Sequence, residues 1–137
     1  MSCEPAVTLP AAVEARIIAH ARQAAPAECC GLLLGTPLAI HEARPAPNAA
    51  DDVVRQYRID PREHLEAIRE ARRRAWDVIG AYHSHPRTAA LPSPTDAREA
   101  FGGFVFVIVG FEAGRPDVRA WRWQEGNFAS VPLVRVE

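Results

Sequence analysis

The stretch that decides the fold and the chemistry reads Gly80-Ala81-Tyr82-His83-Ser84-His85-Pro86. Apolar and aromatic residues lead into it from Trp76, and the proline ends it, so we expect a strand over residues 76–85. Side chains two apart on a strand point to the same face of the sheet. The spacing therefore predicts that His83 and His85 present both imidazoles on one side.

The residues that follow bring the chain back toward this histidine pair. A loop over residues 87–92 precedes Ser93-Pro94-Thr95-Asp96, in which Ser93 can cap a helix and Pro94 can take its first position. That geometry can bring the Asp96 carboxylate close to the two histidines. Two imidazole nitrogens and one carboxylate oxygen form a set that zinc accepts while a fourth position stays open for water. An open position is typical of catalytic rather than structural zinc.

Each part of this pattern also has a plainer interpretation. Two histidines at a strand end can simply be exposed, and Ser-Pro-Thr-Asp is a good helix cap by itself. The two roles of Asp96 are compatible, because a carboxylate in the first helical turn can still be free to bind a metal. The fixed spacing of Asp96 from His83 and His85 is what favours a metal site.

Length and composition narrow the function further. The 137 residues, 48% of them hydrophobic, suffice for one compact domain over residues 1–137. Sixteen basic residues against 17 acidic ones do not make the surface that binding to nucleic acid phosphates requires. The longest apolar run, residues 104–109, is far shorter than the roughly 20 residues that cross a bilayer, so we expect no membrane span. Residues 1–10 lack a signal pattern, and three cysteines cannot pair completely, which predicts a cytoplasmic protein.

The other expected elements alternate between helices and strands. A helix is predicted over residues 10–24, and a second begins at Asp60 with Leu65, Ile68 and Ala71 as its buried stripe. Strands are predicted over residues 29–35, 38–43, 53–59, 104–109, 117–123 and 128–136. Pro132 places the last strand at a sheet edge, because proline cannot donate to a ladder. This order predicts an α/β (α+β) fold with a mixed sheet flanked by helices.

Taken together, His83-Ser84-His85-Pro86, the six-residue spacer and Ser93-Pro94-Thr95-Asp96 resemble the signature of the JAMM/MPN+ zinc metallopeptidases. That family also has a glutamate directly before a Cys-Gly-Leu-like strand, and this chain reads Glu28-Cys29-Cys30-Gly31-Leu32-Leu33. The resemblance covers nearly the whole chain and includes Tyr57-Arg58-Ile59-Asp60-Pro61, which is similar to bacterial members. It implies a single MPN-like domain of cytidine-deaminase-like architecture.

The resemblance also implies a role for each of five residues. His83, His85 and Asp96 would ligate Zn²⁺ and thereby lower the pKa of a bound water. Glu28 would be the general base that takes a proton from this water and passes it to the leaving amine. Ser93 would donate a hydrogen bond to the oxyanion.

The substrate follows from the resemblance as well. Members of the family cut amide or isopeptide bonds after the Gly-Gly tail of ubiquitin or ubiquitin-like proteins. A short, bacterial-looking member resembles those that act on a sulfur-carrier protein, releasing an amino acid such as cysteine or trimming the tail to expose Gly-Gly. The sequence does not indicate the oligomeric state.

Three other functions compete with this one as interpretations of the sequence. A non-catalytic MPN scaffold that binds partner proteins is the main alternative, and the intact set of five residues argues against it. A zinc deaminase needs His-x-Glu and Pro-Cys-x-x-Cys, and the sequence contains neither. Catalysis by the thiols of Cys29 or Cys30 is disfavoured because the run around them is apolar.

Overall fold

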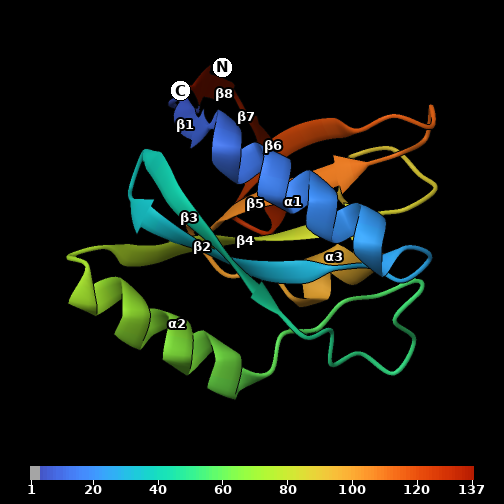
Figure 1. Cartoon of the computed structure of the whole chain (residues 1–137), viewed down its shortest axis with the longest axis horizontal. Coiled ribbons are helices and arrows are strands. Elements are labelled where there is room, and N and C mark those ends of the chain that lie inside the picture. The colour runs from blue at the N-terminus through green and yellow to red at the C-terminus, as the bar shows by residue number, and fades with distance from the viewer. Residues whose placement is uncertain (1–3) are drawn as a thin grey trace.

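Eight strands of the computed structural model, which describes residues 4–137, form one mixed sheet, and three helices accompany it (Figure 1). The helices are α1 (Ala11–Ala24), α2 (Pro61–Arg73) and α3 (Pro94–Arg98). The strands are β1 (Val7–Pro10), β2 (Cys30–Thr36), β3 (Ala39–Ala46), β4 (Asp77–His85), β5 (Val105–Gly110), β6 (Asp117–Gln124), β7 (Asn127–Val131) and β8 (Leu133–Val136).

The strand order in the sheet is β7-β6-β5-β4-β2-β3-β1-β8. β4 pairs parallel with β5 and antiparallel with β2, so the strand that carries the histidines lies at the centre. Every residue of β5 is buried, as its continuous apolar run predicts for a strand covered on both faces. The expected mixed sheet flanked by helices is confirmed.

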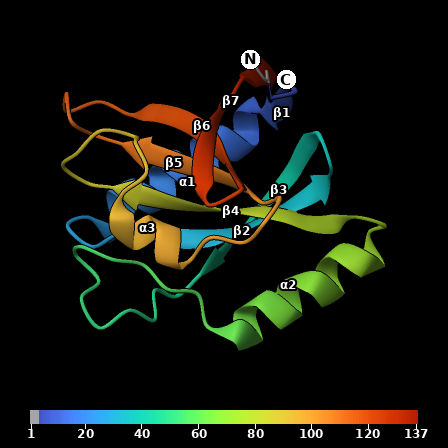
Figure 2. The same cartoon turned by 180° about the vertical axis from the view of Figure 1, so that it is seen from behind.

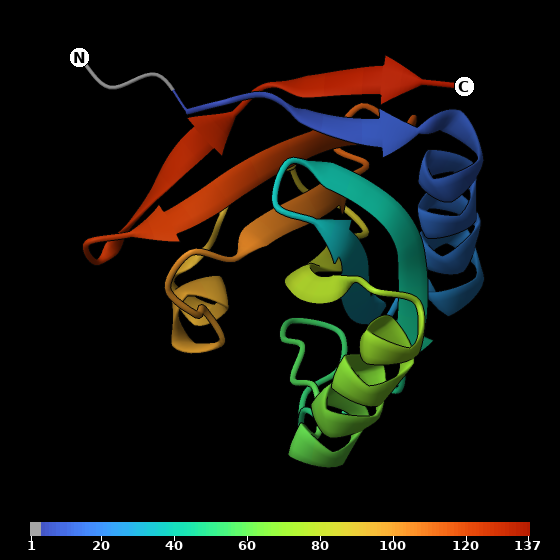
Figure 3. The same cartoon turned by 90° about the vertical axis from the view of Figure 1, so that its left-hand side faces the viewer.

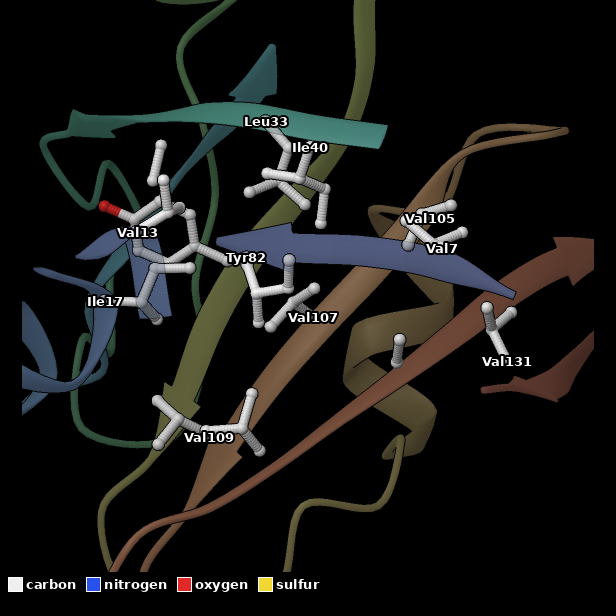
Figure 4. Packing of buried hydrophobic residues seen from close by; sticks show 14 of the residues in the cluster. Val7, Val13, Ile17, Leu33, Ile40, Tyr82, Val105, Val107, Val109 and Val131 are labelled. Carbon is white, nitrogen blue, oxygen red and sulfur yellow. The ribbon is translucent and has the colours of Figure 1, made fainter. Parts of the chain in front are cut away.

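Helix α1 covers one face of the sheet and helix α2 packs on the opposite face of β2 and β4 (Figures 1 and 2). Figure 4 shows the α1 side, where Ile17 of the helix packs toward Tyr82 of β4 and Val107 of β5. Ile17 is fully buried, and such burial stabilises the fold by about 1.5–3 kcal/mol per side chain.

The two faces of β4 carry different residues. Tyr82 points into the α1 side of the core, whereas Ala81 belongs to the cluster on the α2 side. Because side chains alternate along a strand, His83 and His85 share the face of Ala81. Both histidines therefore face the side of the sheet that carries α2.

Helix α2 begins as the sequence predicts, and its predicted buried stripe is right at Ala71, half-buried at Ile68 and wrong at Leu65. Asp60 caps it by accepting a hydrogen bond from the backbone N–H of Arg62 at 2.8 Å. The buried positions are Ala67 and Ala71, whereas Leu65 is 47% exposed, so the stripe predicted from Leu65 was wrong at that position. The small side chains let the helix lie close to Leu32 and Leu34 of β2.

The strand expected over residues 53–59 does not form. Residues 51–55 form bends and turns, and residues 56–60 have no regular secondary structure. The Asn48 side chain takes the place of a partner strand here, because it accepts from the N–H of Arg58 at 3.2 Å and donates to the carbonyl of Gln56 at 2.9 Å. Local side-chain hydrogen bonds of this kind compete with sheet formation.

The expected last strand is in fact two strands. Pro132 separates β7 from β8, which lie at opposite ends of the strand order, so the edge position is confirmed and the single strand is wrong. β8 pairs with β1, a short strand that the sequence pattern did not predict, and the two run side by side in the same direction (Figure 3). The carbonyl of Pro132 accepts from the N–H of Val7 at 2.9 Å.

Among residues 4–137, no helix has the length and apolar character needed to cross a bilayer.

Candidate metal centre

Four buried polar side chains meet at one end of β4. The potential ligand atoms of Glu28, His83, His85 and Asp96 all lie within 4.8 Å of one another. Glu28 stands two residues before β2, the histidines end β4, and Asp96 belongs to α3. All four are at least 94% buried, with exposed fractions of 6%, 1%, 6% and 3%. The structure thus brings together the four residues that the sequence pattern selects.

The backbone after β4 fixes the orientation of the His85 ring. Its Nδ1 lies 2.8 Å from the carbonyl oxygen of Ala89. A carbonyl only accepts hydrogen bonds, so Nδ1 carries a proton, and Nε2 is the ring nitrogen that faces the cluster. That Nε2 lies 3.2 Å from Nε2 of His83. Both imidazoles therefore direct Nε2 into the cluster.

The carboxylate of Asp96 has two roles at once. Its Oδ1 lies 3.1 Å from His83 Nε2, and its Oδ2 lies 3.2 Å from His85 Nε2. Oδ2 also accepts from the backbone N–H of Ser93 at 2.8 Å, while Ser93 Oγ accepts from the N–H of Asp96 at 3.2 Å. This reciprocal capping box starts α3 and holds the carboxylate against the histidines. The helix-cap interpretation of Asp96 and its place in the cluster are both correct.

Glu28 is held firmly by its backbone while its side chain stays free to react. Its N–H donates to the carbonyl of Val53 at 2.7 Å, and its carbonyl accepts from Asn48 Nδ2 at 3.1 Å. The carboxylate atom Oε1 is buried and has no hydrogen-bond partner within residues 4–137. Burial raises the pKa of this carboxyl to about 7, and His85 opposes the rise. A carboxylate of that pKa can take and release a proton near neutrality.

The charges of the cluster suit a divalent cation. Burial lowers the pKa of His83 and keeps its ring neutral. Burial also acts against ionisation of Asp96, but hydrogen bonds from His83 and His85 prevail and lower the pKa of this carboxyl. Burial would likewise lower the pKa of His85, but its contacts with Asp96 raise it. Metals bind imidazole and carboxyl groups in their deprotonated forms, and a cation such as Zn²⁺ would replace the proton that His85 shares with Asp96, so these residues fit it.

The cluster opens to a pocket of ≈340 Å³ whose walls include Glu28, His85 and Ser93. Ser93 Oγ lies 2.8 Å from Thr95 Oγ1, and either atom can be the donor. Because Oγ uses a lone pair toward the N–H of Asp96, its own proton can turn either to Thr95 or to a molecule in this pocket. Ser93 thus lies where the sequence pattern places it, at the wall of the site.

Three residues around the cluster were missed from the sequence. Asn48 anchors Glu28, Tyr57 stacks on His83, and Ser84 Oγ accepts from the N–H of Cys29 at 2.8 Å. Asn48 and Ser84 carry no motif that reveals these contacts. Tyr57 belongs to the Tyr57–Pro61 segment, whose resemblance to bacterial family members is the one sequence feature that could have drawn attention to it.

The two cysteines next to Glu28 are free and buried. Burial raises the pKa of the Cys29 thiol to about 11 and that of Cys30 to about 12. A thiol must ionise to act as a nucleophile, so neither is suited to that role near neutral pH. Both side chains pack in the core together with the apolar run around them.

Comparisons of the amino-acid sequence agree with this geometry. Residues 10–124 match the model of the prokaryotic homologues of the JAB domain. The chain is 35% identical to a desampylase of Haloferax volcanii over 124 residues, which cover 85% of this chain and 88% of that protein. It is 35% identical to a probable TtuB-protein conjugate cleaving protease of Thermus thermophilus, over 85% of this chain and 75% of that one. It is 32% identical to the CysO-cysteine peptidase of Mycobacterium tuberculosis, over 88% and 85% of the two chains.

Solved structures show the same fold. A protein from Desulfitobacterium hafniense superposes with a TM-score of 0.86 at 31% sequence identity, over 96% of this chain and 93% of that one. A JAB1/MPN domain protein from Archaeoglobus fulgidus superposes with a TM-score of 0.60 at 20% identity, over 93% and 98% of the two chains. The second likeness concerns the fold alone.

Proposed function

Because this chain belongs to the prokaryotic homologues of the JAB domain, we propose that it is a zinc-dependent peptidase that acts on a ubiquitin-like protein. In this proposal it hydrolyses the amide bond after the C-terminal Gly-Gly tail of a sulfur-carrier protein, with residues 1–137 as one domain. The names of its relatives support this substrate class, since they include a desampylase and a CysO-cysteine peptidase. The free, buried thiols of Cys29 and Cys30 are consistent with work in a reducing cytoplasm.

The observation that carries the proposal is the buried cluster of Glu28, His83, His85 and Asp96. His83, His85 and Asp96 would hold the zinc ion. When bound, zinc supplies Lewis-acid chemistry, which polarises a carbonyl and lowers the pKa of water. The remaining steps belong to the side chains of the chain itself.

Glu28 would move the proton that hydrolysis requires. Its Oε1 has no hydrogen-bond partner within residues 4–137, so it can accept a proton from the attacking water. The water oxygen then bonds to the scissile carbonyl carbon, and the same carboxyl returns the proton to the nitrogen as the C–N bond breaks. A pKa of about 7 suits both directions of this transfer.

Ser93 would stabilise the negative charge that develops on the scissile carbonyl oxygen. Its hydroxyl lines the same pocket as Glu28, and the capping box fixes its position. A donor that is already in place needs no rearrangement as charge develops, which is the source of its catalytic effect.

If the protein were a non-catalytic scaffold, nothing would explain why Glu28 is buried with an unpartnered carboxylate oxygen within residues 4–137. A buried carboxylate oxygen without a partner destabilises a fold by about 1–3 kcal/mol or more. A protein that only binds partners has no use for this group, whereas a hydrolase needs it as a base.

The test uses zinc-loaded protein and a sulfur-carrier protein that ends in Gly-Gly-Cys, with the product mass as readout. The carrier protein is expected to lose the mass of one cysteine residue. Glu28→Gln should slow the reaction by about 10²- to 10⁴-fold while zinc stays bound. Glu112→Gln, in the exposed turn after β5, is the matched control and should keep the full rate. Cleavage at an undiminished rate by Glu28→Gln, or wild-type protein that leaves the tail intact, would contradict the proposal.

A further inference from the structure

The proposed substrate poses a recognition problem that rests on the proposed function. Two glycines offer no side chain, so a protein can hold them only through their backbone carbonyl and N–H groups. Peptides bound in this way take their affinity from main-chain hydrogen bonds. The site must therefore contain polar groups that the fold itself leaves free.

Tyr57 provides such a group beside the metal centre. Tyr57 lies in the irregular segment after β3 and is only 5% exposed. Its ring stacks on the ring of His83, with centroids 4.2 Å apart and an angle of 19° between the planes. Its hydroxyl is buried and has no hydrogen-bond partner within residues 4–137.

The other tyrosine shows what a satisfied buried hydroxyl looks like in this fold. Tyr82 is also buried, and its hydroxyl lies 2.8 Å from Nδ1 of His20. It points to the α1 face, away from the histidine cluster. Most buried polar groups have such a partner, so the hydroxyl of Tyr57, which has none within residues 4–137, is available to a bound ligand.

Tyr57 also borders pockets next to the metal centre. It lines a polar pocket of ≈250 Å³ between the segment of residues 50–58 and helix α3, which lie close together in Figures 1 and 2. Thr95 is shared between this pocket and the one that holds Glu28 and Ser93. On its other side Tyr57 lines an apolar pocket of ≈210 Å³ with Phe101 and Phe104. The three pockets thus follow one another around α3.

A tyrosine hydroxyl keeps its proton at physiological pH, because a phenol ionises only near pH 10. It can therefore donate a hydrogen bond. The natural acceptor in a glycine tail is a backbone carbonyl oxygen.

We propose that the Tyr57 hydroxyl donates a hydrogen bond to a backbone carbonyl of the Gly-Gly tail and so positions the scissile bond at the metal centre. Tyr57 is then a substrate-binding residue as well as a support for His83. Phenylalanine at this position keeps the stacked ring and removes only the donor, which separates the two roles.

Binding is measured in a Glu28→Gln background so that the tail is not cut. The ligand is a peptide with the last residues of a sulfur-carrier protein, ending in Gly-Gly-Cys, and calorimetry gives the Kd. Tyr57→Phe should weaken binding by about 5- to 20-fold, as expected for one hydrogen bond to a ligand. It should also raise Tm by roughly 2–5 °C, because a buried hydroxyl without a partner is removed. Zinc content should not change.

Tyr82→Phe is the matched control, since it removes the other buried tyrosine hydroxyl. It should lower Tm, because His20 loses its partner, and leave the Kd unchanged. A peptide with a trans-alkene in place of the Gly-Gly amide tests the contact itself. Tyr57→Phe and the alkene each remove one partner of the same hydrogen bond. If the hydroxyl donates to that carbonyl, the loss of binding free energy from both changes together should be smaller than the sum of the two separate losses.

The outcomes separate the two proposals. If wild-type protein neither binds nor cuts the tail, the proposed function fails and this inference fails with it. If wild-type protein cuts the tail but Tyr57→Phe binds the peptide as tightly as its parent, only the hydrogen bond from Tyr57 is excluded. A higher Tm with unchanged Kd would then mark the hydroxyl as a structural defect without a role in recognition.

Discussion

The side-chain amide of Asn48 donates a 3.1 Å hydrogen bond to the backbone carbonyl of Glu28, and so ties the loop after β3 to the proposed catalytic base. The same side chain donates to Gln56 and accepts from the N–H groups of Ala50 and Arg58. One residue therefore positions both Glu28 and the segment that carries Tyr57.

Asn48→Ala should damage activity and stability together. It leaves two carbonyls and two N–H groups without this partner, which should lower the free energy of unfolding by about 1–3 kcal/mol. A small displacement of Glu28 should reduce kcat/KM for tail cleavage by roughly 10- to 100-fold. Urea unfolding and steady-state kinetics measure the two effects. Asn127→Ala, at an exposed position of β7, is the control and should change neither the stability nor kcat/KM. If the two variants behave alike, Asn48 does not position Glu28.

Glu28→Gln should stabilise the metal-free protein, and more so at higher pH. The folded pKa of about 7 lies above the usual value of 4.5, so the native state binds this proton more tightly than the unfolded chain does. The stability from this proton is complete below about pH 4.5 and is lost as pH rises through 7. The gain from glutamine should thus be small at pH 5 and reach about 1–3 kcal/mol at pH 8. Urea unfolding in a chelator gives both values, and a gain independent of pH would contradict the expectation.

Ser93 should show separate effects on folding and on catalysis. Ser93→Ala removes the cap of α3 and should lower the free energy of unfolding by about 1 kcal/mol. It also removes the proposed oxyanion donor, which should lower kcat by about 10²- to 10³-fold. Ser93→Thr keeps the hydroxyl, so it should retain most of the stability and most of the kcat of the wild-type protein. If Ser93→Ala loses stability but keeps kcat, Ser93 is only a helix cap.

Asp96→Asn separates the carboxylate charge from the capping geometry. The asparagine oxygen can still accept from the N–H of Ser93, so α3 should form, although the metal-free protein should lose some stability because His83 and His85 lose their charged acceptor. Zinc content, measured by atomic absorption after dialysis, should fall strongly, because a neutral amide is a poor replacement for a carboxylate ligand. Full zinc retention in this variant would remove Asp96 from the ligand set.

The thiols of Cys29 and Cys30 should resist alkylation in the native protein. Both are buried with raised pKa values, so little thiolate exists at pH 8. Mass spectrometry after iodoacetamide treatment, in a Cys3→Ser background, should show no adduct until urea is added. Rapid modification without loss of structure would mean that this strand opens more readily than its burial indicates.

The metal cluster could be predicted from the sequence because its geometry is local. His83 and His85 are two apart on a strand, and Ser93 and Asp96 stand at fixed positions of a helix start, so short-range rules place three of the four side chains. Glu28 needed the family resemblance, since the pairing of β2 with β4 that brings it to the cluster involves residues far apart in sequence.

The loop between β3 and α2 shows where sequence patterns fail. Val53, Tyr57 and Ile59 alternate like a strand, but the hydrogen bonds of Asn48 hold the segment outside the sheet. Such side-chain contacts leave no periodic signal. For the same reason the stacking of Tyr57 on His83 became visible only in three dimensions.

The pairing of β1 with β8 sets a limit on how this protein can fold during synthesis. Val7 pairs with Leu133, so one edge of β1 stays uncovered until the residues near 133 have been made, although β3 can cover the other edge earlier. Contacts between such distant residues slow folding. The strands of the metal cluster are complete well before then, so a nascent chain can assemble the reactive end of the molecule while its first strand still exposes hydrogen-bonding groups.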